Sequence, residues 1–142
     1  MGLKKRTFWS IAAGVLLFDQ ATKYSIRTFQ VNSNFRILQI HPIQNTGVAF
    51  GLFKNMNVVW ALVSAAVILA ICYKFRNILN QRDAFGWALI LGGATGNLLD
   101  RLLLGGVTDF IDFGWWPAFN IADSALSVGI IYLLYMNWKE NK

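Results

Sequence analysis

The chain has 142 residues, of which 56% are hydrophobic and only 14% are charged, and its net charge is +6. Soluble globular domains are about 45–50% apolar and about 25% charged, so this composition excludes an ordinary soluble domain and indicates one membrane domain over 1–142. A single cysteine and a single histidine exclude the usual zinc ligand sets, and no metal or organic cofactor is expected. The basic residues lie at the ends of apolar runs, which argues against a nucleic-acid partner.

Four apolar segments predict four membrane-spanning helices, at about 8–26, 56–75, 84–104 and 119–138. The second contains an apolar run that fills 58–73, slightly short of the roughly 20 residues that a span needs. The first begins with basic residues like a cleavable signal peptide, but no small-x-small cleavage site follows it, so a retained helix is favoured. The fold class predicted from the sequence is therefore an all-α membrane protein.

Positive charge predicts the orientation of these helices. Eight Lys or Arg residues flank the helices on the side of the two termini and only three flank them on the other side, over about 27–55 and 105–118. Because basic residues are retained in the cytoplasm, both termini are predicted to be cytoplasmic and those two segments to face outward.

Five of the seven acidic residues fall in, or just outside, the predicted outer half of the membrane: Asp19, Asp100, Asp109, Asp112 and Asp123. An ionisable group at the bilayer centre costs about 2.5–3.5 kcal/mol on insertion scales, which makes each such residue a functional candidate. Local pairing is the simpler interpretation of Asp19, because Lys23 lies four residues on along the same helix face. Asp100 and the adjacent Arg101 project about 100° apart and are expected to pair poorly with each other.

Asp109 and Asp123 have no cation near them in the sequence, since no Lys or Arg lies between Arg101 and Lys139. Two carboxylates that meet without a cation share one proton and titrate as a unit. One base and one acid in a single site are what water-mediated peptide hydrolysis requires. The sequence does not show that the two side chains meet, only that both lie at the outer end of the third and fourth helices.

The sequence contains few residues that could support another catalytic mechanism. Cys72 is remote from the acidic residues and is interpreted as a small packing residue, and His41 precedes a proline and is interpreted as a turn residue. Gly92 and Gly96 have the small-x-x-x-small spacing that lets helices approach closely. The glycine-punctuated segment 45–51 is either a solvent-facing turn or an extended strand that pairs with a substrate backbone.

Four blocks of the sequence resemble the bacterial lipoprotein signal peptidases (signal peptidase II), a family of small four-helix aspartic proteases of the inner membrane. The blocks are F-D-Q-A-T-K (18–23), N-T-G-V-A-F-G (45–51), G-N-L-L-D-R-L-L-L-G-G-V-T-D-F (96–110) and F-N-I-A-D-S (119–124). The resemblance implies a small periplasmic β-rich cradle and a short periplasmic helix, for which 29–56 and 105–118 are the candidates.

The resemblance also implies a site and a substrate. The implied catalytic pair is Asp109 and Asp123, and the implied supporting or substrate-binding residues are Asp19, Lys23, Asn45, Asn97, Asp100, Arg101 and Asn120. Family enzymes remove the signal peptide from prolipoproteins whose cysteine carries diacylglycerol, cutting before that cysteine. The implied partners are thus prolipoproteins and membrane lipids, and the implied location is the bacterial inner membrane with the site towards the outer leaflet.

Two other functions fit parts of the pattern. A small four-helix proton-coupled transporter would also use intramembrane carboxylates, but it predicts acids near the midplane and a continuous polar path. A non-catalytic adaptor or lipid-binding protein would use the aspartates only for structural pairing.

Overall fold

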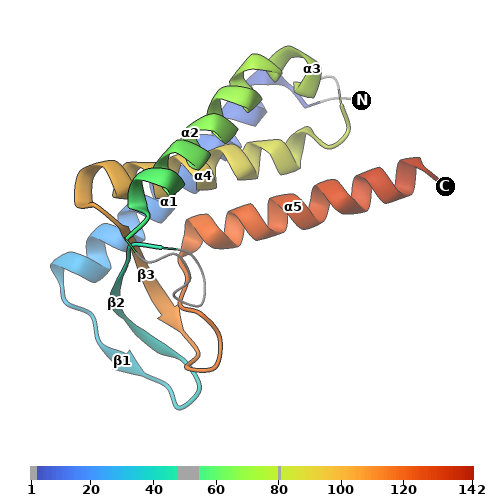
Figure 1. Cartoon of the computed structure of the whole chain (residues 1–142). Helices are drawn as coiled ribbons and strands as arrows, with labels where there is room; N and C mark the ends of the chain where they lie inside the picture. The colour runs from blue at the N-terminus through green and yellow to red at the C-terminus, as the bar shows by residue number, and fades with distance from the viewer. Residues whose placement is uncertain (1–2, 48–54, 80) are drawn as a thin grey trace.

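The computed structural model describes residues 3–47, 55–79 and 81–142, most of which form long helices and a small sheet (Figure 1). The helices are α1 (Lys5–Thr28), α2 (Asn57–Tyr73), the short α3 (Phe75–Leu79), α4 (Ala84–Leu104) and α5 (Ile121–Glu140). The strands are β1 (Ser33–Asn34), β2 (Gln39–Asn45) and β3 (Val107–Asp112). The four long helices cover the four predicted segments, with ends displaced by three residues or fewer.

The sheet lies at one end of the helices, and the two chain termini and α3 lie at the other (Figure 1). β2 is the middle strand and pairs antiparallel with both β1 and β3, so strands far apart in the sequence are joined. Its register shifts between Ile40 and Ile43, where Pro42 has no N–H to offer the ladder. The interpretation of His41 as a turn residue is wrong, because it lies inside β2.

The two predicted outer segments contain the strands of this small sheet, as the implied β-rich cradle requires. The implied short periplasmic helix is not found among the described residues of these segments, and 48–54 lie outside the described residues. The short helix α3 lies instead between α2 and α4, at the end away from the sheet (Figure 1).

Close approach of α4 to its neighbours depends on glycine. A Cβ added to Gly92 would lie 2.6 Å from the carbonyl oxygen of Ala12 in α1, and one added to Gly93 would lie 2.6 Å from that of Ala122 in α5. Because almost no space separates the backbones, α1 and α5 lie directly against α4. The predicted close packing at this glycine-rich stretch is confirmed, and it brings the polar ends of three helices together.

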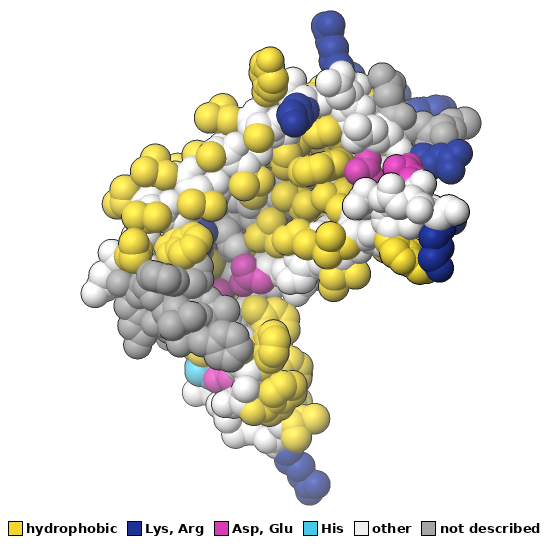
Figure 2. Space-filling view, turned by 45° about the vertical axis from the view of Figure 1, so that its right-hand side comes forward, with side chains coloured by type: hydrophobic (Ala, Val, Ile, Leu, Met, Phe, Trp, Pro, Cys, Tyr) yellow, Lys and Arg dark blue, Asp and Glu magenta, His cyan; other side chains and the backbone are white. Residues whose placement is uncertain are grey.

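The helices carry their apolar side chains outward and bury several charged ones, the reverse of a soluble bundle. Exposed apolar residues of α1, α2, α4 and α5 include Leu17, Leu62, Leu69, Leu103 and Ile131. Figure 2 shows hydrophobic side chains over much of the helical surface. Within the described ranges, α5 is the one helix long and apolar enough to cross a membrane by length and composition, and α2 is apolar but has only 17 residues.

Candidate active site

Asp109 and Asp123 line one cavity of about 540 Å³, which opens where the sheet meets α4 and α5. Figure 2 shows acidic side chains in the hollow between the helical part and the sheet. The remaining walls include polar residues (Asn45, Asn97, Arg101) and apolar ones (Val107, Trp116, Pro117, Phe119, Leu126). The cavity therefore combines two carboxyl groups with apolar walls.

The start of α5 holds Asp123 in place. Asn120 is the N-cap residue, and its side-chain oxygen accepts a hydrogen bond of 2.9 Å from the backbone N–H of Asp123. In return, the carboxylate of Asp123 accepts one of 3.2 Å from the backbone N–H of Asn120, which completes a capping box. The sequence pattern N-x-x-D thus both starts the helix and fixes the direction of the carboxylate. A helix N-terminus also favours negative charge at this position.

Asp109 lies in β3 and accepts hydrogen bonds only from neutral amides. Its Oδ1 accepts 2.8 Å from Nδ2 of Asn120, and its Oδ2 accepts 2.9 Å from Nδ2 of Asn45. Burial of the side chain, and secondly the negative charge of Asp123, raise the pKa of Asp109 from 3.8 to about 7. These surroundings favour the protonated form of Asp109 up to about neutral pH.

Asn120 contacts both carboxyl groups, a role that only the structure reveals. The family resemblance implied Asn120 as a supporting residue, and the capping box joins it to Asp123. The contact to Asp109 comes from Nδ2 of the same side chain, which is fully buried. The side-chain amide of Asn120 contacts the carboxyl group of Asp109 and its backbone N–H contacts that of Asp123, so this one residue links the carboxyl groups of β3 and α5.

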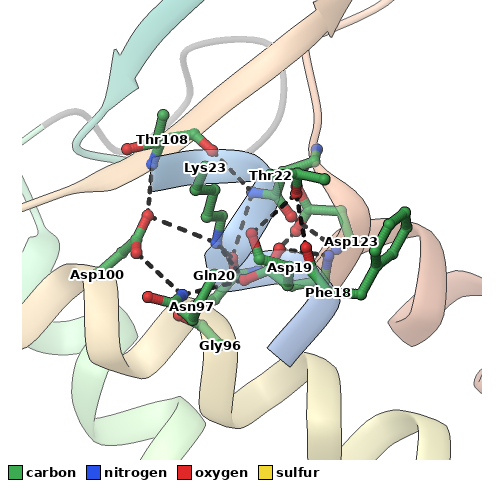
Figure 3. Close-up of polar contacts among 12 residues, drawn as sticks. Phe18, Asp19, Gln20, Thr22, Lys23, Gly96, Asn97, Asp100, Thr108 and Asp123 are labelled. Atoms are coloured by element: carbon green, nitrogen blue, oxygen red, sulfur yellow. Dashed lines mark hydrogen bonds and ion pairs between the residues drawn. The ribbon is translucent and has the colours of Figure 1, made fainter. Parts of the chain in front are cut away.

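A second polar cluster, of charged residues, lies behind the cavity between α1 and α4 (Figure 3). Nζ of Lys23 lies 2.8 Å from Oδ2 of Asp19 and 3.4 Å from Oδ2 of Asp100, and all three side chains are buried. The predicted pairing of Asp19 with Lys23 is confirmed. Asp100 pairs with Lys23 rather than with Arg101, as the poor projection of adjacent helical residues predicted.

Three residues that were not predicted from the sequence complete this cluster: Gln20, Arg27 and Thr108. Nε2 of Gln20 donates 3.2 Å to Oδ1 of Asp100, and Nη1 of Arg27 lies 3.7 Å from its Oδ2. The same guanidinium donates 2.8 Å to Oγ1 of Thr108, whose backbone N–H donates 2.9 Å to Asp100. The repeat of charge at 19, 23 and 27, four residues apart on one helix face, was the signal that would have found Arg27.

Three further predictions concern Arg101, Cys72 and the segment 45–51. Arg101 lines the cavity, and its Nη1 lies 3.5 Å from the backbone oxygen of Asn97 in its own helix. Cys72 is exposed on α2, so its interpretation as a packing residue is wrong, because that face of α2 does not contact the rest of the described chain. In the segment 45–51, for which a strand or a turn was expected, Asn45 is the last residue of β2. Residues 48–51 lie outside the described residues.

In the part of the chain that the structure describes, no group of three or more His, Cys, Asp or Glu side chains is placed to hold a metal ion. His41 contacts Asp112 at 3.3 Å and does not line the cavity, so it supplies no base to either aspartate. The polar side chains among the described lining residues are therefore two carboxyl groups, two amides, one guanidinium, two serine hydroxyls and one indole.

Comparisons with known proteins agree with this geometry. The sequence model of a family described as signal peptidase (SPase) II matches residues 11–139. Proteins named lipoprotein signal peptidase are similar over most of their length: 38% identity in Nostoc punctiforme, covering 99% of this chain and 94% of the relative, and 40% in Moorella thermoacetica, covering 90% of each. A solved bacterial membrane enzyme superposes with a TM-score of 0.90 at 31% identity, covering 99% of this chain and 93% of that one. These similarities do not favour the transporter alternative.

Proposed function

Since the chain belongs to the signal peptidase II family, we propose that it is an intramembrane aspartic endopeptidase that removes signal peptides from diacylglyceryl-modified prolipoproteins, cutting before the lipidated cysteine. The observation that carries the aspartic mechanism is that Asp109 and Asp123 line one cavity and share Asn120 as a hydrogen-bond partner. Two carboxyl groups with one shared proton supply both the base and the acid of peptide hydrolysis.

The surroundings of the two groups support different roles for them. Asp123 lies at the N-terminus of α5 with two N–H donors on its carboxylate, so it is the ionised base that takes a proton from water. Asp109 has a pKa of about 7 and is the protonated acid that donates a hydrogen bond to the scissile carbonyl oxygen. The water oxygen bonds to the carbonyl carbon, the scissile C–N bond then breaks, and the proton held by Asp123 passes to the departing nitrogen. One water is consumed, and a carboxyl group and a new amino terminus are formed.

We further propose that α1, α2, α4 and α5 all span the bilayer, with both termini cytoplasmic and the cavity towards the outer leaflet of the bacterial inner membrane. Supporting this, the termini lie at the end opposite the sheet (Figure 1). The charged side chains that lower the hydropathy of α1 and α4 are turned inward: Asp19, Lys23 and Asp100 are buried against each other. Charged residues of spanning helices face the bundle interior because their exposure to lipid is costly.

The proposal is tested by a gel-shift cleavage assay with a lipidated precursor and its unlipidated form. Asp109→Asn and Asp123→Asn are each expected to abolish cleavage, because an amide neither takes a proton from water nor holds the shared one. Asp112→Asn, on the same strand but outside the cavity lining, is the matched control and is expected to keep turnover. Full turnover by either cavity variant would refute the aspartic mechanism, and equal cleavage of both precursors would refute the lipid requirement.

A further inference from the structure

Lys23 lies deep in the protein, and its ammonium group is surrounded by acceptors. Besides Asp19 and Asp100, Nζ contacts Oδ1 of Asn97 at 3.0 Å (Figure 3). These three acceptors match the three hydrogens of an ammonium group, and the side chain has no measurable exposure. Lys23 does not line the cavity. Pairing with Asp19 and Asp100 explains the charge of Lys23 but not its contact with a neutral amide.

That contact decides which way the amide of Asn97 points. An ammonium group only donates hydrogen bonds, so the oxygen of Asn97 must face Lys23 and its NH₂ group must face away. Nδ2 of Asn97 then donates 2.8 Å to Oδ1 of Asp123. Asn120 adds to the same orientation, since its Nδ2 lies 3.2 Å from Oδ1 of Asn97. A flipped amide would place two donors against its NH₂ group and an oxygen against the carboxylate.

The orientation of the amide matters for the base. A carboxylate that accepts an N–H is stabilised in its ionised form, whereas one that faces a carbonyl oxygen must hold a proton to make a hydrogen bond. A protonated Asp123 has no capacity to take a proton from water. We propose that Lys23 is a positioning residue that acts through Asn97: by donating to the amide oxygen it keeps the NH₂ group on Asp123 and so keeps that carboxylate ready as the base. This inference rests on the proposed function.

Direct electrostatics are the competing explanation. The charged groups that act on Asp123 are Lys23 and Asp19 from α1, Arg101 from α4 and Asp109 from β3. If the positive charge of Lys23 acted through space, any neutral replacement would have the same effect. If Lys23 acts through Asn97, a neutral replacement that still donates will preserve the effect.

Two matched neutral variants separate these explanations. In Asp19→Asn/Lys23→Gln the glutamine amide still donates to Asn97, and in Asp19→Asn/Lys23→Met nothing donates. Both remove one charge of each sign, and the asparagine introduced in α1 keeps an oxygen to accept the 2.8 Å hydrogen bond that Asp19 takes from the backbone N–H of Ala122. The pH dependence of kcat/KM for the lipidated precursor is measured in both. The acid limb is expected to stay at its wild-type position in the glutamine variant and to move up by about one pH unit, a tenfold loss at low pH, in the methionine variant.

A third variant checks the route and protects the test against misfolding. Asn97→Leu leaves the charged cluster intact and is expected to move the acid limb as far as the methionine variant does. Adding Asp19→Asn/Lys23→Met to Asn97→Leu is expected to move it no further, because both changes break the same chain of contacts. A structural role alone would lower the active fraction without moving the limb.

Equal shifts in the glutamine and methionine variants, no shift in Asn97→Leu, or full additivity would each overturn the inference. These outcomes differ from failure of the proposed function, which would appear as cleavage by Asp109→Asn or Asp123→Asn.

Discussion

Replacing Asp109 with asparagine will change how the stability of the protein depends on pH. Burial raises the pKa of Asp109 from 3.8 to about 7 in the folded protein, and the unfolded chain restores the ordinary value. Between about pH 4 and pH 7 the folded protein therefore holds a proton that the unfolded chain has lost, so the free energy of unfolding falls as pH rises. The favourable contribution is complete below about pH 4 and is lost as the pH passes 7.

The size of the effect follows from that pKa difference. At about 1.36 kcal/mol for each pH unit, the ionisable group lowers the free energy of unfolding by about 4 kcal/mol between pH 4 and pH 8. Asparagine does not ionise, but its NH₂ group would face one of the amide donors of Asn45 or Asn120, which costs about 1 kcal/mol. Asp109→Asn is thus expected to be less stable than wild type by about 1 kcal/mol at pH 4 and more stable by about 3 kcal/mol at pH 8.

Denaturant unfolding of the detergent-solubilised protein, followed by tryptophan fluorescence over this pH range, measures both curves. The stability curves of wild type and Asp109→Asn are expected to cross at about pH 4.5. Asp112→Asn is the control, because Asp112 lies on the same strand with a partly exposed side chain and contacts only His41 and a backbone N–H. A constant offset between wild type and Asp109→Asn at every pH would refute the reasoning, as would the same crossing in Asp112→Asn.

Three further changes have definite expected results. Gly96→Ala is expected to destabilise the protein by about 1–3 kcal/mol and to lower cleavage, because the added Cβ would lie 2.5 Å from Oδ2 of Asp19. Gly14→Ala is the control: a Cβ there would meet nothing within 4 Å, so thermal melts are expected to show a neutral or stabilising effect. Asn120→Ala is expected to lower the free energy of unfolding by about 1 kcal/mol, because the helix cap is lost. Its cleavage activity, compared with wild type at a temperature where both proteins are folded, is expected to fall by far more than that loss of stability explains. Trp116→Ala is expected to raise KM for the lipidated precursor with little change in kcat, because Trp116 lies on the apolar wall of the cavity. An unchanged KM would contradict that placement.

Much of the fold was predictable from hydropathy, since the apolar runs coincide with α1, α2, α4 and α5. The sheet was harder to predict, because β2 and β3 are separated in the sequence by two long helices and no local sequence pattern indicates their pairing. His41 shows the difficulty: the following proline favours a turn, yet the strand accommodates it by a shift in register. Tertiary pairing overrides local preference here.

The site was predictable residue by residue but not as an arrangement. The spacing of Asp19 and Lys23 predicted their ion pair. The contacts that join separate elements were not predictable, because they depend on close helix approach. Asn97 reaches both Lys23 and Asp123 only because glycines allow α1 and α5 to lie against α4.

The distribution of charge supports the proposal that the two aspartates of the cavity share a proton. Asp19 and Asp100 are paired with Lys23 and Arg27, so this cluster is neutral as a whole. Among the ion pairs of the described residues, none includes Asp109 or Asp123. Arg101 is the nearby cation, and it makes no direct ion pair with either carboxylate in the described part of the chain. Two carboxyl groups opposed by no paired cation cannot both ionise at low cost, so one proton remains between them at neutral pH. The pairing of Asp19 and Asp100 with basic residues thus supports the proposal that this cavity holds one acid and one base.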